Sequence, residues 1–199
     1  QLTTLGNGAF RNNPAIAKIT FGAGIAAVGD NAFAGNATIE RLTVPKTVTQ
    51  IGAGAFADWS KLNTLTISGN SLALIGSKAF ANTVLLADIY AEPTTAPAIA
   101  SDSFSGAGAS VQGEKTAHVP DVAAYGSWTS ACSQYTFAPL GDDYLSEGVY
   151  YRASAAEKWS TELPAAFASL FVKTAGDNTV MTSAQATAIA NAVKALSAG

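Results

Sequence analysis

The two side chains best suited to nucleophilic catalysis in this sequence are its single histidine, His118, and its single cysteine, Cys132. A thiol beside an imidazole can act as a nucleophile when the fold places the two groups within hydrogen-bonding distance. No spacing supports that arrangement, and the chain has no G-x-S-x-G, H-E-x-x-H or phosphate-binding-loop motif. A lone cysteine is more often a small buried apolar residue than a reactive thiol. We therefore expect no catalysis from this pair.

The acidic residues do not form a convincing site either. Glycoside hydrolysis needs two carboxylates, which Asp142, Asp143 and Glu147 could supply, but adjacent acids beside glycine in a turn are usually solvated. Residues 176–180 superficially resemble a calcium-binding loop before a helix. Placing Asp177 at loop position 1 or 5 leaves an alanine at position 12, where the loop needs an acidic ligand. We expect a protein that is not an enzyme and that holds no metal ion or cofactor.

The remaining candidates are positioned by an internal repeat with a period of 23 or 24 residues. The most regular member of each repeat is a phenylalanine, which occurs at Phe10, Phe33, Phe56, Phe80 and Phe104. Strand-like segments with one apolar side recur with it at residues 16–21, 39–44, 62–67 and 86–91. A fixed period in the twenties with an L-x-x-L-x-L core predicts a leucine-rich-repeat solenoid. We predict an α/β solenoid of about five coils, with short parallel strands, short helical turns and a stacked phenylalanine core.

Polar residues alternate with the apolar ones in these segments, so they would face outward and stack from coil to coil. The first predicted ladder contains Lys18, Arg41, Thr64, Asp88 and Thr116. The second predicted ladder contains Thr20, Thr43, Thr66, Tyr90 and His118. Solenoids use such extended faces to bind partners. Our candidate partner-binding residues are Lys18, Arg41, Thr64, Thr66, Asp88, Tyr90 and His118.

Each feature of this surface also has a purely structural explanation. The threonines favour sheet formation in any case, so they are equally well explained as a soluble β surface. Lys18 beside Arg41 would be mildly unfavourable, and it is either tolerated because Glu40 and Asp30 are near or suited to an acidic group of a partner. Tyr90 beside His118 would place amphipathic area at one end of the face, and tyrosine is enriched at interfaces.

Two irregular stretches depart from the repeat. The third coil is one residue longer, and we expect a turn at residues 68–71 to absorb the insertion without disturbing the core. After residue 104 the repeat degenerates, and four aromatic residues follow: Tyr125, Trp128, Tyr135 and Phe137. We expect them to cover the open end of the solenoid as a terminal cap, in preference to forming a sugar-binding platform.

The unit L-x-x-I-x-I-P…V-x-x-I-G…A-F, seen most clearly at residues 42–45, 48–52 and 55–56, resembles the BspA-like leucine-rich repeats of bacterial surface proteins. The resemblance covers about residues 1–139, because residues 117–128 are similar to the irregular terminal coil of that family. It implies a surface-exposed binding or adhesion module whose partner is a host or bacterial surface protein or a glycan. The family shares a scaffold and no common site, so the resemblance is specific for fold and weak for function.

Residues 140–199 form a second predicted region, a small α+β appendage that resembles no family we recognise. A strand is expected at residues 148–153 and a short helix at residues 164–171, with proline in its first turn. A capping box at residues 182–185 begins a second helix with an apolar stripe that reaches Leu196.

Composition limits the classes of partner and the location. Charged residues make up 13 % of the chain and the formal net charge is −3, so nothing favours nucleic acid or an anionic membrane. No stretch is apolar and long enough to span a bilayer. The chain begins at Gln1 without an initiator methionine, and we expect an export signal upstream. We predict a non-catalytic extracellular or cell-surface binding module, or alternatively a structural spacer that displays neighbouring domains.

Overall fold

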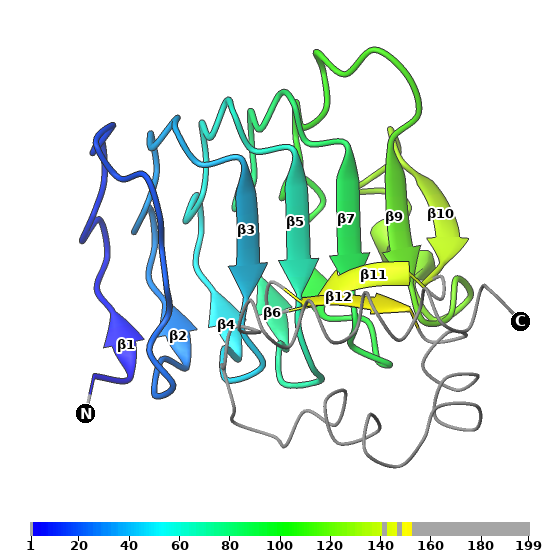
Figure 1. Ribbon diagram of the computed structural model, residues 1–199, viewed down its shortest axis with the longest axis horizontal. Coiled ribbons are helices and arrows are strands. Elements are labelled where there is room, and N and C mark those ends of the chain that lie inside the picture. Colours follow the sequence, from blue (N-terminus) through cyan, green and yellow to red (C-terminus); the bar gives the residue numbers. More distant parts are fainter. Residues whose placement is uncertain (1, 141–142, 147–148, 153–199) are drawn as a thin grey trace, which may run out of the picture. The chain divides into compact units, whose positions relative to one another are not determined.

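The computed structural model describes residues 2–140, 143–146 and 149–152 (Figure 1). The chain divides into two compact units, Gln1–Tyr151 and Arg152–Gly199. The strand expected at residues 148–153 is present as β12 (Val149–Arg152), which pairs with β11 (Asp143–Ser146) in a two-stranded sheet. The helices expected at residues 164–171 and from residue 182 onward lie outside the described residues, so the α+β fold of this region stays a prediction.

The first unit is a solenoid built on two parallel sheets of five strands each (Figure 1). The short-strand sheet contains β1 (Thr4–Leu5), β2 (Ala27–Val28), β4 (Gln50–Ile51), β6 (Leu74–Ile75) and β8 (Ala98–Ile99). The long-strand sheet contains β3 (Arg41–Val44), β5 (Thr64–Ile67), β7 (Asp88–Ala91), β9 (Thr116–Val119) and β10 (Thr136–Pro139). Each strand pairs with its equivalent in the next coil, so the predicted parallel stacking is confirmed.

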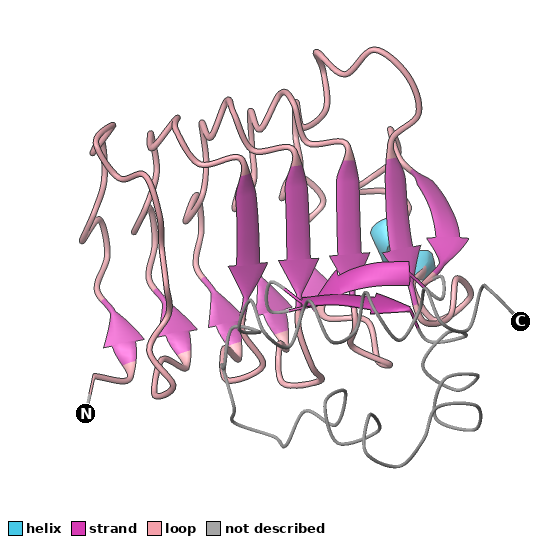
Figure 2. Cartoon of the chain, in the orientation of Figure 1, coloured by secondary structure: helices cyan, strands magenta, loops and turns pink. Residues whose placement is uncertain are grey.

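The α/β class is not confirmed, because the described residues contain almost no helix. One short 3-10 helix, η1 (Gly126–Trp128), is present, and Figure 2 shows the rest of the described residues as strands and loops. In place of the expected helical turns, each coil has a run of consecutive turns that contains its phenylalanine, and we call these runs the arms. They are residues 7–12, 30–35, 53–58, 77–82 and 101–110. The first unit, as far as it is described, is therefore a parallel-strand β-solenoid of about six turns, one more than predicted.

Residues in the left-handed backbone conformation, with positive φ, explain why these arms do not form helices. Each of four successive arms contains two positions with positive φ, a conformation incompatible with a right-handed helix. They are Gly8 and Asn12, Asn31 and Gly35, Gly54 and Asp58, and Lys78 and Asn82. Glycine, asparagine and aspartate adopt this conformation most easily, and they occupy seven of these eight positions.

The backbone–backbone hydrogen bonds between successive arms run in one direction along the solenoid. The backbone N–H of Phe33 donates to the Ala55 carbonyl at 2.8 Å, and that of Phe56 donates to the Ala79 carbonyl at 2.8 Å. The N–H groups of Gly8, Phe10 and Asn12 donate in the same way to carbonyls of the second arm. An arm therefore presents N–H donors to the following coil and carbonyl acceptors to the preceding one.

The predicted phenylalanine column is confirmed as the core of the solenoid. Neighbouring rings stack with centroids 5.1, 5.6, 5.4 and 5.1 Å apart, in the order Phe10, Phe33, Phe56, Phe80 and Phe104. Trp59 packs edge-on against two of these rings, and its indole N–H donates to the Phe33 carbonyl at 2.7 Å. Stacked rings of this kind contribute energy beyond the area that they bury.

The inserted residue in the third coil is accommodated in a turn, as expected. Gly69 has a φ of 67°, and its N–H donates to Glu92 Oε2 at 2.7 Å. Ile67 and Leu72, on either side of the turn, both remain buried in the core. Coils of 23 and 24 residues can therefore share one core.

Candidate interaction surface

The outward face of the long-strand sheet has the register that the repeat predicts. Arg41 lies opposite Thr64, Thr64 opposite Asp88, and Asp88 opposite Thr116. The second ladder pairs Thr43 with Thr66, Thr66 with Tyr90, and Tyr90 with His118. Alternate residues of β3, β7 and β9 are buried in the core, so the ladder residues between them are on the other face of the sheet.

Lys18 and Thr20 are not part of these ladders, so the predicted beginning of both was wrong. Residues 16–21 form no strand, and the long-strand sheet begins at β3. This segment is linked to the next coil by a side-chain hydrogen bond and not by strand pairing, because the Thr38 hydroxyl donates to the Ile16 carbonyl. Lys18 is exposed but outside the sheet, and the predicted Lys18–Arg41 neighbour pair is absent from the register.

Thr66 also differs from expectation, because it is buried and has an exposed fraction of 1 %. It lies in the interior strand β5 between Thr43 and Tyr90, and β11 contacts β5. A partner approaching the sheet therefore meets other ladder residues first. Thr64, on the same strand, remains half-exposed, and its hydroxyl donates to Asn63 Oδ1 at 2.8 Å.

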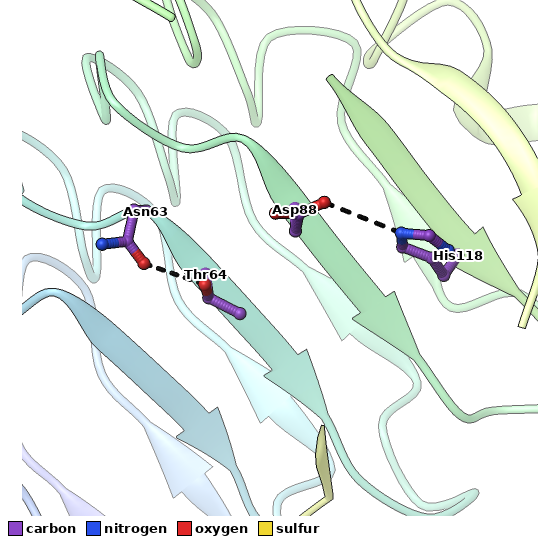
Figure 3. A network of polar contacts seen from close by, with 4 residues as sticks. All are labelled: Asn63, Thr64, Asp88 and His118. Atoms are coloured by element: carbon purple, nitrogen blue, oxygen red, sulfur yellow. Dashed lines mark hydrogen bonds and ion pairs between the residues drawn. The ribbon is translucent and has the colours of Figure 1, made fainter. Parts of the chain in front are cut away.

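Asp88, Tyr90 and His118 form a cluster on β7 and β9, which we call the β7–β9 cluster. The Tyr90 and His118 rings stack with centroids 4.5 Å apart and an interplanar angle of 5°. His118 Nε2 lies 3.6 Å from Asp88 Oδ1, a diagonal contact between neighbouring strands (Figure 3). The Asp88 side chain is 43 % exposed and that of His118 is 24 % exposed.

The ladder alignment anticipated the Tyr90–His118 contact but missed two others. Asp88 and His118 were assigned to different ladders, and the diagonal approach that joins them is within reach of these side chains in a parallel pair. Asn63 lies within the predicted segment 62–67 but belongs to neither predicted ladder, and the observed strand β5 begins one residue later. Its position directly before Thr64, a polar residue at a strand end, was the available signal.

The terminal aromatic residues form a cap, and their burial leaves no open sugar-binding platform. Tyr125 and Trp128 are fully buried, and Phe137 packs against the same core. The Tyr125 hydroxyl donates to the Pro93 carbonyl at 2.7 Å, and the Trp128 indole donates to the Pro97 carbonyl at 2.9 Å. Tyr135 donates to the Leu86 carbonyl at 2.8 Å, and burial raises its pKa well above the usual range.

Cys132 and His118 lie in different environments, so the fold does not support a nucleophilic pair. Cys132 is buried within the hydrophobic core, as expected of a lone structural cysteine. Burial raises the pKa of its thiol from 9.0 to about 12, which keeps it protonated at neutral pH. His118 instead stacks on Tyr90 at the outward face of β9.

Two further kinds of feature are absent from the described residues. That part of the chain brings no three metal-binding side chains together into a group. It also contains no helix of the length and hydrophobicity needed to cross a membrane.

Comparison with known proteins identifies the repeat. Residues 1–109 match a family described as the BspA type leucine-rich repeat region in six copies. The chain is also similar to the crystal structure of a leucine-rich repeat protein from Bacteroides ovatus, with 21 % identity and a TM-score of 0.43. That match covers 52 % of this chain and 26 % of the other, so the chain spans about a quarter of that protein. No curated protein matches the chain.

Proposed function

The chain belongs to the family of BspA-type leucine-rich repeat proteins, and from this premise we propose that it is a binding or adhesion module at the bacterial surface or secreted from the cell. Leucine-rich-repeat solenoids are typically non-catalytic scaffolds that present an extended face to a partner. The partner classes that we propose are a host or bacterial surface protein, or a glycan.

The observation that carries this proposal is the β7–β9 cluster. It gathers a carboxylate, a phenol and an imidazole on the outward face of an otherwise threonine-rich sheet. Asp88 is the more exposed of the two side chains in its contact with His118, so it is accessible to a partner. Tyrosine is enriched at protein interfaces because its ring combines apolar area with a polar group.

A binding screen tests the proposal. The full chain would be screened against extracellular-matrix proteins and a glycan array, together with the triple variant Asp88→Asn, Tyr90→Ala and His118→Ala. Gln50→Ala with Leu74→Ala provides a matched control, because both side chains are exposed on the short-strand sheet. We expect a partner whose binding is lost in the triple variant and kept in the control.

The remaining predicted residues are tested in the same screen. Charge reversal by Lys18→Glu and Arg41→Glu changes residues that lie outside the cluster. Binding lost only in this pair would move the interaction to the beginning of the solenoid. Binding unchanged in every variant would contradict the proposal that the sheet face is the site.

A second candidate function is a structural spacer, and the ring column favours it. Five stacked rings and two continuous sheets link successive coils, an arrangement that resists bending between them. A spacer predicts that no partner in the screen depends on the solenoid surface. It also predicts that any interaction of a longer protein is retained when this surface is changed and lost when a neighbouring domain is removed.

A further inference from the structure

The β7–β9 cluster contains the only side chain of this protein that ordinarily changes charge between pH 5 and 8. Histidine is the residue type that gains a proton in this interval, and the chain has one. The single cysteine does not add a second titration there, because its pKa is raised to about 12. A pH-dependent charge on the sheet face therefore comes from His118.

Asp88 is the group that this charge would act on. Its carboxylate lies 3.6 Å from His118 Nε2, and no other basic residue in the described part of the chain forms an ion pair with it. Lys115 directly precedes β9, the strand that contains His118, and its ammonium group donates to the Gly108 carbonyl at 3.5 Å. Arg41 is two strands away in the register, about 10 Å at the usual strand spacing.

The groups that face His118 from the neighbouring strands are known from the register. From β7 these are Asp88 and Tyr90. From β10 they are Ala138, which lies opposite His118, and Thr136, and neither of these two side chains is titratable. The charge of His118 is therefore felt mainly by Asp88. Protonation would convert an exposed carboxylate beside a neutral ring into a paired carboxylate.

We propose that Asp88 receives a lysine or arginine side chain of a protein partner, and that protonation of His118 competes with that side chain for the carboxylate. This proposal rests on the proposed function and assigns a partner chemistry to its site. When the imidazole is neutral, the Asp88 carboxylate attracts a cation from the partner. When the imidazole is protonated, the imidazolium both pairs with Asp88 and repels the incoming cation.

Affinity for a cationic group therefore decreases as the pH falls. An exposed ion pair of this kind contributes modestly, so we expect a decrease on the order of twofold to fivefold between pH 8 and pH 5. The exposed fraction of Asp88, 43 %, leaves room for a second donor while His118 remains beside it. The Tyr90 ring stacks on the imidazole and restricts its position beside Asp88.

The single histidine makes the proposal directly measurable by proton NMR, because its imidazole signals need no assignment. The full chain would be titrated with N-acetyl-arginine methylamide at pH 8 and at pH 5, with the uncharged citrulline analogue as the control probe. We expect the arginine probe to shift the imidazole signals at pH 8 more than the citrulline probe does. The effect should be weaker at pH 5.

Two variants separate charge from shape. Asp88→Asn keeps the size of the side chain and should abolish the difference between the two probes. His118→Gln should keep arginine binding, followed through the backbone amide of Asp88, and make it independent of pH. Backbone amide spectra of each variant at both pH values confirm that the chain is folded.

Three results would overturn the proposal: equal shifts with both probes, arginine binding that persists in Asp88→Asn, or binding that strengthens at pH 5. The test needs no natural partner, so its failure differs from a failure of the proposed function. A screen that finds a partner on the β7–β9 cluster, together with a negative arginine test, would reject only the cationic chemistry.

Discussion

Among single residues, Gly52 shows most clearly what close stacking of the coils demands. A Cβ atom at Gly52 would lie 2.6 Å from Asp30 Oδ1 and 2.7 Å from the Asp30 backbone nitrogen. The equivalent position in the next coil, Gly76, meets the backbone nitrogen of Ala53 at 2.7 Å in the same way. These glycines are required because the neighbouring backbone occupies the place of a side chain.

Gly52→Ala should therefore lower the free energy of unfolding by about 1–3 kcal/mol, since backbone must move to admit the methyl group. Gly6→Ala is a matched control at the equivalent position of the first coil, where no atom lies within 4 Å of the added carbon. Urea unfolding of both variants measures the difference. Equal destabilisation would show that the coil-to-coil approach is not the cause.

Cys132 gives a prediction about alkaline pH. At neutral pH its thiol is protonated in the folded and the unfolded chain, and burial raises the folded pKa from 9.0 to about 12. As the pH rises from 9 toward 12, the unfolded chain releases the thiol proton while the folded chain keeps it, so the free energy of unfolding falls. Cys132→Ala should show a shallower fall in urea unfolding over this interval. An identical pH dependence in both proteins would contradict the assignment to Cys132.

Among the elements, the strands and the ring column are predictable from sequence, and the arms are not. Apolar alternation locates β3, β5 and β7, and the period of the phenylalanines gives the stacking, because both patterns report which side chains are buried. The arms follow backbone conformation, which hydrophobic periodicity does not report. The recurring glycine, asparagine and aspartate residues were the signal that argued against helical turns.

The repeat pattern likewise predicts only part of the candidate site. The repeat predicts the register of Tyr90 and His118 correctly, because equivalent positions must pair. It does not predict that residues 16–21 lie outside the sheet or that Thr66 is buried. Both outcomes depend on what lies beside a segment in space, which one period of the sequence does not contain.

The ring column should show a gradient of stability. Phe56 is fully buried with a ring stacked on each face, so Phe56→Ala should lower the free energy of unfolding by about 3–5 kcal/mol. Phe10 is 42 % exposed and is stacked on Phe33, so Phe10→Ala should cost much less. Thermal unfolding of the two variants provides the comparison. A similar loss at both positions would show that the column acts as a single unit.

For the solenoid as a whole, the cap determines how the last coils are protected. Trp128 is fully buried, packs beside Phe104 and Tyr125, and satisfies the Pro97 carbonyl. It thus covers the end of the column that the repeat itself leaves open. Terminal units of this kind are required for the solubility and stability of repeat proteins.

Trp128→Ala should therefore destabilise the coils nearest the cap before the others. We expect a loss of about 3–5 kcal/mol and faster hydrogen exchange in β7 and β9 than in β4. Trp128→Phe is the conservative control, since it keeps most of the apolar volume and loses the bond to Pro97. Uniformly faster exchange across all coils would show that the solenoid unfolds as one cooperative unit.

The one-way hydrogen bonds between the arms have an evolutionary consequence. Because each arm offers donors forward and acceptors backward, any coil can follow any other in the same orientation. Duplication of one coil's coding segment therefore yields a unit that already fits its neighbours, and the turn at Gly69 shows that an extra residue does not spoil the fit. Genes of this type can lengthen or shorten by whole repeats while the surviving coils keep their packing. Selection is then free to act on the outward residues of each copy separately.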